Sequence, residues 1–408
     1  MQAGSRHIQS ISRTLLTIEE PPARAALDSL PFLRLGFRPF YALAALFAML
    51  AIPLWVSAYL GFWRATPHIS VYWHMHEMVF GFAVAVVIGF LYTAARNWTG
   101  IWTPRAAHLG LLAALWIAGR LAMLFAPAAL AWPVDAAFIP LAAWPLFRVL
   151  QKSGNRRNYF LVGLLGVLAA LNLLFHGGVQ GCMGIDPMHM AQAAILVIVL
   201  IEMAIGARVI PMFTANAVPG VKQSKDERRD RLSVALTVIA ALGWILAAPG
   251  PLVAATCFAA AASQLLRVAG WGGQRTLHNP LLWILHVSWL WIPAGFFMLG
   301  LAALHLLTLS AAFHAFALGS MAGLIIGMIT RTALGHTGRP LKAGRAESLM
   351  YLAIQCGAIL RTYAAASPAY GAQVALIGSA LCWTLAFGAY LAVYGPYLMQ
   401  PRIDGKDG

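Results

Sequence analysis

Two histidines and a carboxylate stand together at the start of a long apolar stretch, in the segment Trp73-His74-Met75-His76-Glu77. Imidazole is the commonest metal ligand in proteins, and a nearby carboxylate can orient the ring or transfer a proton. Ionisable groups inside a membrane span are costly, so they are candidates for function by default. The segment therefore predicts a metal site or a proton-transfer site.

The spacing in this segment separates the roles of the two rings. Residues i and i+2 of a helix point roughly 200° apart, so His74 and His76 are not expected to chelate one ion on a regular helix. Either the chain enters the span in a non-helical conformation, or the rings serve different centres. Glu77 lies three residues after His74 and shares its face, which makes it a candidate to orient that ring or to carry protons. An ion pair between Glu77 and Arg120 is the alternative.

Further histidines lie within or at the edges of other apolar stretches: His176, His189, His286, His305 and His314. Counted at about 1.5 Å per residue along the expected spans, His286 and His314 come to similar depths and could share a site near the midplane. A lone histidine in a span can also be a packing residue that bonds to a neighbouring helix. Acidic residues are few within these apolar stretches, so the histidines there are not explained as ion pairs, which favours a metal or haem site. Asp135 and Asp186 are expected to be solvated at the outer edge.

The composition requires a membrane protein. Of 408 residues, 61% are hydrophobic and only 10% are charged, whereas charged residues make up about 25% of soluble domains. The net charge of +15 is explained by the Lys and Arg residues that membrane proteins keep in cytoplasmic loops, so nucleic acid is not expected as a partner. The four cysteines form no CxxC pair and are interpreted as packing residues.

A span needs about 20 mostly apolar residues, and on this criterion we expect twelve stretches to cross the lipid bilayer. They are residues 39–60, 71–95, 107–126, 130–150, 158–178, 187–212, 231–248, 251–270, 279–299, 302–330, 347–366 and 370–395. We expect an all-α polytopic membrane protein with an N-terminal segment (1–38), one twelve-helix membrane domain (39–395) and a short tail (396–408).

The loops between these stretches alternate in charge. Lys and Arg gather in every second loop, and the outer loops keep only Arg64 and Arg361. This alternation places both termini in the cytoplasm. The second, sixth and tenth spans also end in similar Thr-containing turns, which hints at an internal repeat.

The ordered motifs of the chain resemble those of the NnrS family over about residues 31 to 395. They are Leu35-Gly36-Phe37-Arg38-Pro39-Phe40, the segment from Trp73 to Phe82, Asn97-Trp98-Thr99-Gly100, Gly119-Arg120, the segment from Arg208 to Thr214, the segment from Leu281 to His286, and His314 with the segment from Arg331 to Pro340. The resemblance implies a bacterial inner-membrane protein that contains haem b and copper and is linked to denitrification and to resistance against nitric oxide.

On this resemblance we expect the protein to bind nitric oxide and to detoxify or reduce it. The expected haem-binding residues are His314, His286, Arg120 and Arg208; the expected metal ligands are His74, His76, His176 and His189; and Glu77 is the expected catalytic group. Which histidine binds haem and which binds copper stays open. A reductase would need a separate electron donor, because the chain shows no soluble cofactor domain. The alternatives are a non-catalytic nitric oxide sensor and a secondary transporter with a histidine-lined path.

Overall fold

The computed structural model of the chain describes residues 30–63, 68–224, 226–367 and 371–406. Most of the expected N-terminal segment (1–38) and Arg64 lie outside the described residues. Within the described chain the regular structure is helical and contains no strand. The expected all-α fold is therefore confirmed.

The helices follow the chain from end to end. The first eight are α1 (Phe37–Tyr59), α2 (Val71–His76), α3 (Val84–Thr99), α4 (Ala106–Phe125), α5 (Ala128–Ala136), α6 (Phe138–Lys152), α7 (Tyr159–Val179) and α8 (Pro187–Ala217). The others are α9 (Glu227–Ile245), α10 (Gly250–Ala269), α11 (Pro280–Ala303), α12 (Leu309–His314), α13 (Gly323–His336), α14 (Arg345–Ala366) and α15 (Ala372–Met399). Short 3₁₀ helices include η2 (Pro31–Leu33), η4 (Arg156–Asn158), η5 (Cys182–Gly184) and η6 (Gly273–Thr276).

Eleven helical stretches of the described chain are long and apolar enough to cross a membrane, so the chain is a multi-pass membrane protein. The expected span at 231–248 is helix α9, which begins with the charged segment Glu227-Arg228-Arg229-Asp230-Arg231. That leaves about 14 residues of apolar helix, fewer than the roughly 20 that a span requires. α9 packs against α8 and α10 instead of standing alone.

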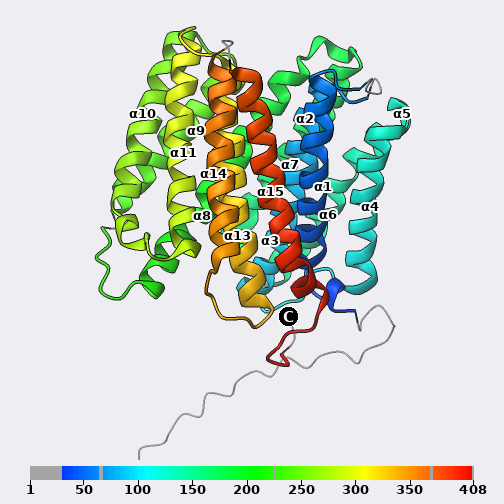
Figure 1. Cartoon of the computed structure of the whole chain (residues 1–408), viewed down its shortest axis with the longest axis vertical. Helices are drawn as coiled ribbons and strands as arrows, with labels where there is room; N and C mark the ends of the chain where they lie inside the picture. The colour runs from blue at the N-terminus through cyan, green and yellow to red at the C-terminus, as the bar shows by residue number, and fades with distance from the viewer. Residues whose placement is uncertain (1–29, 64–67, 225, 368–370, 407–408) are drawn as a thin grey trace, which may run out of the picture.

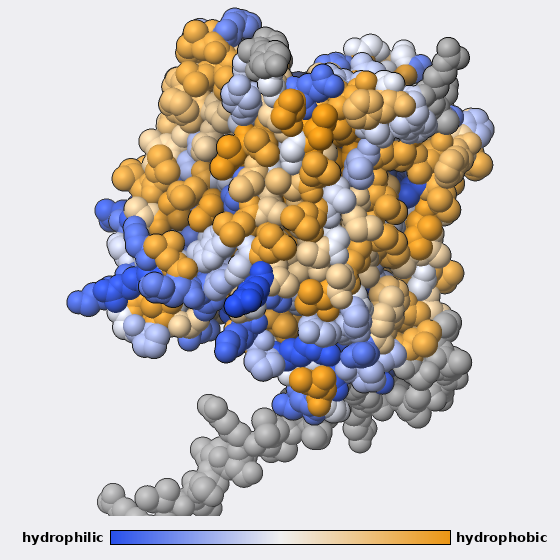
Figure 2. Space-filling view, in the orientation of Figure 1, coloured by the Kyte–Doolittle hydropathy of each residue, from blue (hydrophilic) through white to orange (hydrophobic). Residues whose placement is uncertain are grey.

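The helices lie side by side in a bundle, and the start of α1 and the end of α15 meet at the same end of it (Figure 1). Arg38 of α1 joins them, because its Nη1 donates to the carbonyls of Leu398 at 2.9 Å and Gln400 at 2.7 Å. Figure 2 shows hydrophobic residues over the middle of the visible face and hydrophilic residues gathered at its lower end. Such a band is the surface that a bilayer core covers.

Two spans are built on one plan, and both contain a π-helical segment. The first broken span is α2, η3 (Glu77–Ala83) and α3; the second is α12, η7 (Ala315–Ala322) and α13. Each begins at a hydroxyl cap: Ser70 Oγ accepts from the Trp73 N–H at 3.3 Å, and Thr308 Oγ1 from the Ala311 N–H at 3.2 Å. A six-residue α-helix follows each cap and leads into the π-helix.

The match between the two broken spans extends to their glycines. Gly81 and Gly319 each lie eleven residues after the cap, and Gly100 and Gly338 lie thirty residues after it. The latter pair end the spans with φ of 69° and 79°, a left-handed conformation that glycine adopts without strain. The repeat expected among three spans is thus visible in two, while the sixth span, α8, runs as unbroken α-helix. π-helical segments are often found at functional sites.

Candidate functional site

His76, the last residue of α2, is fully buried and has partners at both ring nitrogens. Its Nδ1 lies 3.0 Å from Glu77 Oε1. Its Nε2 lies 3.0 Å from Asp135 Oδ2 and 2.9 Å from Asn172 Oδ1. Segments from α2, α5 and α7 therefore meet at one imidazole ring inside the bundle.

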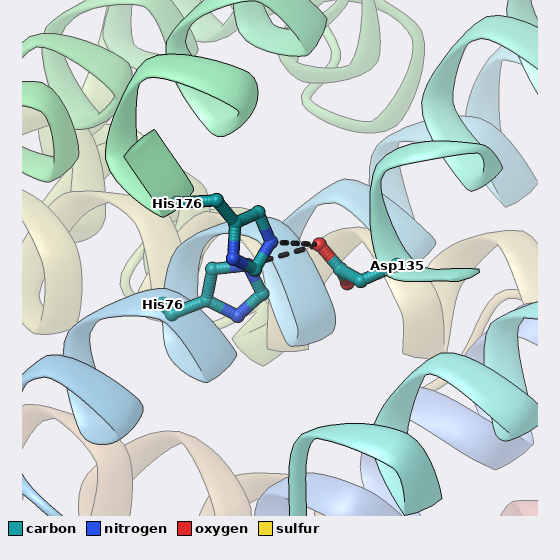
Figure 3. Close-up of side chains that lie close together, drawn as sticks. All are labelled: His76, Asp135 and His176. Carbon is teal, nitrogen blue, oxygen red and sulfur yellow. Dashed lines mark hydrogen bonds and ion pairs between the residues drawn. The ribbon is translucent and has the colours of Figure 1, made fainter. Parts of the chain in front are cut away.

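His176 of α7 reaches the same carboxylate. Its Nε2 lies 2.9 Å from Asp135 Oδ2, and the two histidine rings turn toward this oxygen from the same side in Figure 3. Asn172, one helical turn before His176, donates to Asp135 Oδ2 at 2.8 Å. The one oxygen atom thus has three nitrogen neighbours.

Arg120 of α4 joins the two carboxylates of the site. Its Nη1 donates to Glu77 Oε2 at 3.0 Å, and its Nη2 donates to Asp135 Oδ1. Gly81 makes room for this guanidinium, because a Cβ at that position would collide with Arg120 Nη1. We call the group the polar centre; its members are His76, Glu77, Arg120, Asp135, Asn172 and His176.

Three ligand atoms of the polar centre converge as a metal site requires. One ring nitrogen of His76, one ring nitrogen of His176 and a carboxylate oxygen of Asp135 all lie within 4.8 Å of one another. Ligands at about 2.0–2.2 Å from an ion and at right angles are about 3 Å apart, and both nitrogen–oxygen separations are 2.9 to 3.0 Å. Glu77 at Nδ1 of His76 is the second partner that metal-bound histidines usually have. The residues therefore fit an ion such as copper or iron.

His74 faces a different environment, as the spacing predicts. Its ring stacks on Trp55 with the ring centres 3.9 Å apart, and its buried Nδ1 has no hydrogen-bond partner among the residues that the structure describes. The ring lines a cavity of about 250 Å³, which we call the histidine cavity; its other polar lining residues include His314, Arg361 and Gln192.

The histidine cavity lies between the two π-helical segments. Most of its walls are apolar, with Met78, Val79 and Phe82 from η3, and Ala317, Leu318 and Met321 from η7. His314 Nδ1 lies 2.6 Å from the Ser310 carbonyl oxygen. A carbonyl can only accept, so Nδ1 carries the proton and Nε2 keeps its lone pair. This is the arrangement of an imidazole prepared to bind a metal or haem iron.

The structure separates His286 from His314. His286 Nε2 lies 2.8 Å from Thr214 Oγ1, near the end of α8, whereas Met188 at the start of α8 lines the histidine cavity. Thr214 lies 26 positions after Met188, which corresponds to about 39 Å along the helix. The expected common site near the midplane is therefore wrong. Each ring lies within the first two turns of its own span, and these spans start at opposite ends of the bundle.

Two other expected site residues have local partners elsewhere. His189 Nε2 donates to the Ile245 carbonyl at 3.0 Å. Arg208 Nη1 donates to Asn158 Oδ1 at 3.3 Å. Neither belongs to the polar centre or to the lining of the histidine cavity in the described part of the chain. Both are interpreted as residues that tie neighbouring helices together.

The expected roles of two carboxylates need correction. Glu77 was expected beside His74, yet it contacts the ring of His76, and it also forms the ion pair with Arg120 that was the alternative. Asp135 was expected to be solvated, yet it is 3% exposed and lies at the middle of the polar centre. Sequence reasoning missed Asn172, although it lies four residues before His176 and so shares its helix face.

A family model described as "NnrS protein" matches residues 31–402. This range contains all the residues of the polar centre and of the histidine cavity. No curated protein matches the chain.

Proposed function

The chain belongs to the NnrS family, and we propose that it is a metal-dependent membrane protein that binds nitric oxide and removes it by detoxification or reduction. Family membership supports a link to nitric oxide. The observation that carries the proposal is the convergence of His76, Asp135 and His176 on one point inside the membrane bundle. A buried set of this kind in a span is costly to keep without a function.

We assign copper to the polar centre and haem b to the histidine cavity. His76, Asp135 and His176 would hold the copper ion, with Glu77 orienting the first ring. His314 would bind haem iron through Nε2, with His74 beside it in the same cavity. The bound haem and copper would supply coordination positions for nitric oxide.

The residues of the chain have separate tasks in this proposal. The apolar walls of the histidine cavity admit a small uncharged gas from the bilayer and keep water out. Glu77 bridges His76 and Arg120, so it can pass a proton at Oε1 while Arg120 holds its other oxygen in place. Reduction of nitric oxide consumes electrons and protons, so a separate electron donor is required. We place the protein in the bacterial inner membrane, with the Arg-rich end of the bundle in the cytoplasm.

Spectroscopy and elemental analysis of the detergent-purified protein test the proposal. We expect a haem Soret band that shifts with nitric oxide, together with bound copper. His76→Ala and His176→Ala should lose the copper and keep the haem, whereas His314→Ala should lose the haem. His189→Ala is the matched control, because this outer histidine bonds only to a backbone carbonyl in the described chain.

Four results would contradict the proposal or one of its assignments. Protein without haem and without metal would overturn the proposed function as a whole. Iron in place of copper at the polar centre would overturn the copper assignment alone. Loss of haem in His76→Ala with retention of haem in His314→Ala would show that the haem and copper assignments are reversed. Binding of nitric oxide without turnover, in the presence of a reductant, would identify a sensor.

A further inference from the structure

The histidine cavity contains a positive charge for which its walls provide no counter-ion. Arg361 of α14 is the one arginine or lysine among the described lining residues, and these include no aspartate or glutamate. Within the described chain no hydrogen bond or ion pair is formed by the Arg361 side chain. A charge inside a membrane protein is costly unless it is paired. An anion in the cavity would remove this cost.

Gln192 of α8 supplies a second polar group to the same cavity. The residue lines the cavity and is only 6% exposed. Its amide has no hydrogen-bond partner among the residues that the structure describes. Buried amides usually have partners for both the N–H groups and the carbonyl oxygen. The amide of Gln192 therefore indicates a ligand group that neighbouring helices do not supply.

Arg361 and His314 lie at similar depths in the cavity. Thr308 Oγ1 donates to the Ala365 carbonyl at 2.6 Å, which sets the start of α12 beside the end of α14. Counted inward from this bond, Arg361 lies four residues along α14 and His314 six residues along α12, or about 6 Å and 9 Å of helix. A ligand bound at Nε2 of His314 would therefore have the guanidinium within its reach.

We propose that Arg361 and Gln192 form a subsite of the histidine cavity that binds a planar group with two oxygens. A guanidinium presents its N–H groups in a rigid fork that matches the paired oxygens of a carboxylate. The amide of Gln192 adds a further donor beside this fork. A few polar groups that converge in a mostly apolar cavity are the usual arrangement of a small-molecule site.

Two sources can supply such a group. The first is the propionate of haem, and this source rests on the proposed function. The cavity walls suit the flat apolar body of such a molecule, because they include aromatic side chains. These are Trp55, Phe82, Phe313 and Trp383. The second source is a free small anion such as formate or nitrite, which does not depend on haem.

Protohaem and its dimethyl ester, which lacks the carboxylates, test the first source. Both are titrated into detergent-purified full-length protein from haem-deficient cells, and the Soret band gives the dissociation constants. We expect the wild type to bind protohaem at least tenfold more tightly than the diester. Arg361→Gln should lose most of this preference, yet bind the diester as the wild type does, because His314 is unchanged. Arg361→Lys keeps the charge without the planar fork and should fall between the two.

Formate tests the second source on the same haem-free protein. The melting temperature is followed by tryptophan fluorescence during the titration, since a ligand that binds the folded state raises it. Chloride at equal ionic strength is the reference, because it has no paired oxygens. A rise with formate that is lost in Arg361→Gln and reduced in Gln192→Leu supports the subsite with a free anion as its ligand.

The matched control is Arg228→Gln, which removes an exposed arginine outside the histidine cavity. It should behave like the wild type with every probe. Equal affinities of the wild type for protohaem and the diester, together with no effect of formate, would overturn the proposal. Equal changes in Arg361→Gln and Arg228→Gln would also overturn it. The wild-type comparison decides the question even if Arg361→Gln does not fold.

The two probes also keep this inference apart from the proposed function. Protein that binds neither form of haem would overturn the haem site, and the formate titration would then decide the subsite alone. Protein that binds haem through His314 without any preference for the carboxylates, and does not respond to formate, would overturn the subsite and leave the haem site in place.

Discussion

His76 and His314 occupy the same place in the two broken spans, yet their surroundings are opposite. Each lies six residues after the capping hydroxyl and directly before a π-helical segment. Each also has an arginine nearby from the next long helix: Arg120 contacts the neighbours of His76, and Arg361 lines the cavity with His314. One backbone plan therefore places an imidazole and a guanidinium together twice.

The residues around the two histidines account for their different surroundings. Glu77 follows His76 and Asp135 faces it, whereas Ala315 follows His314 and the walls around it are mostly apolar. With two carboxylates, the surroundings of His76 become a closed network whose oxygen and nitrogen atoms are of the kind that could hold an ion. Without carboxylates, the surroundings of His314 form a cavity with an available imidazole nitrogen. The same framework thus gives a candidate ion site in one span and a cavity beside the other, and the neighbouring acids decide which.

The largest effect is expected from the two arginines. Arg120→Met removes the cation between two buried carboxylates, and an uncompensated buried charge costs about 3–5 kcal/mol. Arg361→Met, in the histidine cavity, should cost clearly less, because no carboxylate in the described chain is bonded to it. The free energy of unfolding in mixed detergent micelles measures both. Equal losses of unfolding free energy in the two variants would show that the surroundings of His76 and His314 do not differ in charge as described.

Substitutions of the residues at Nδ1 of His76 and of His314 compare how the two imidazole rings are held. Glu77→Gln weakens the acceptor at His76 Nδ1, and loss of such a partner costs about 10–100-fold in metal affinity. Ser310→Ala should leave haem binding unchanged, since His314 Nδ1 is held by the Ser310 backbone carbonyl and not by its side chain alone. Metal titration and haem content are the measurements. Unchanged metal affinity in Glu77→Gln would remove Glu77 from this role.

The paired glycines test whether the π-helical segments have equivalent functions. A Cβ at Gly81 would collide with Arg120, and a Cβ at Gly319 would collide with the Trp291 ring. Each alanine variant should lose about 1–3 kcal/mol of stability through overpacking. Gly81→Ala should also lower metal occupancy, because it displaces a member of the polar centre, whereas Gly319→Ala should leave that occupancy unchanged. Equal metal contents would contradict this distinction.

Much of this architecture follows from the sequence. Runs of about 20 apolar residues predict the membrane spans, and the only expected span that falls short is α9, where charged residues occupy the first turns. The divergence of His74 and His76 follows from helix geometry alone. Both inferences depend on properties that are local to one helix.

Apart from the Glu77–Arg120 ion pair, which the sequence offered as an alternative, the partners of the site residues could not be predicted, because they come from packing between helices. Asp135 and Asn172 lie on α5 and α7, and nothing within either helix indicates that they meet His76. The depth of His314 was misjudged because apolar residues before Thr308 were counted as helix, although the span begins at Leu309. A π-helical segment also changes the angle between successive residues. The residues that share a helix face on either side of η3 therefore cannot be assigned from the spacing of an ideal α-helix.

The smallest expected effect concerns the two caps that start the broken spans. Ser70→Ala and Thr308→Ala each leave an N–H of the first turn without its side-chain acceptor, which costs about 1 kcal/mol. Thr308→Ala should cost more, because Thr308 Oγ1 also donates to the Ala365 carbonyl at 2.6 Å and so holds the second broken span to α14. Unfolding free energies of Thr308→Ala and Thr308→Ser measure this contribution, since Ser keeps the hydroxyl and should restore most of the stability. A Thr308→Ala loss no greater than that of Ser70→Ala would mean that the bond to α14 contributes nothing, and that the two spans start in energetically equivalent ways.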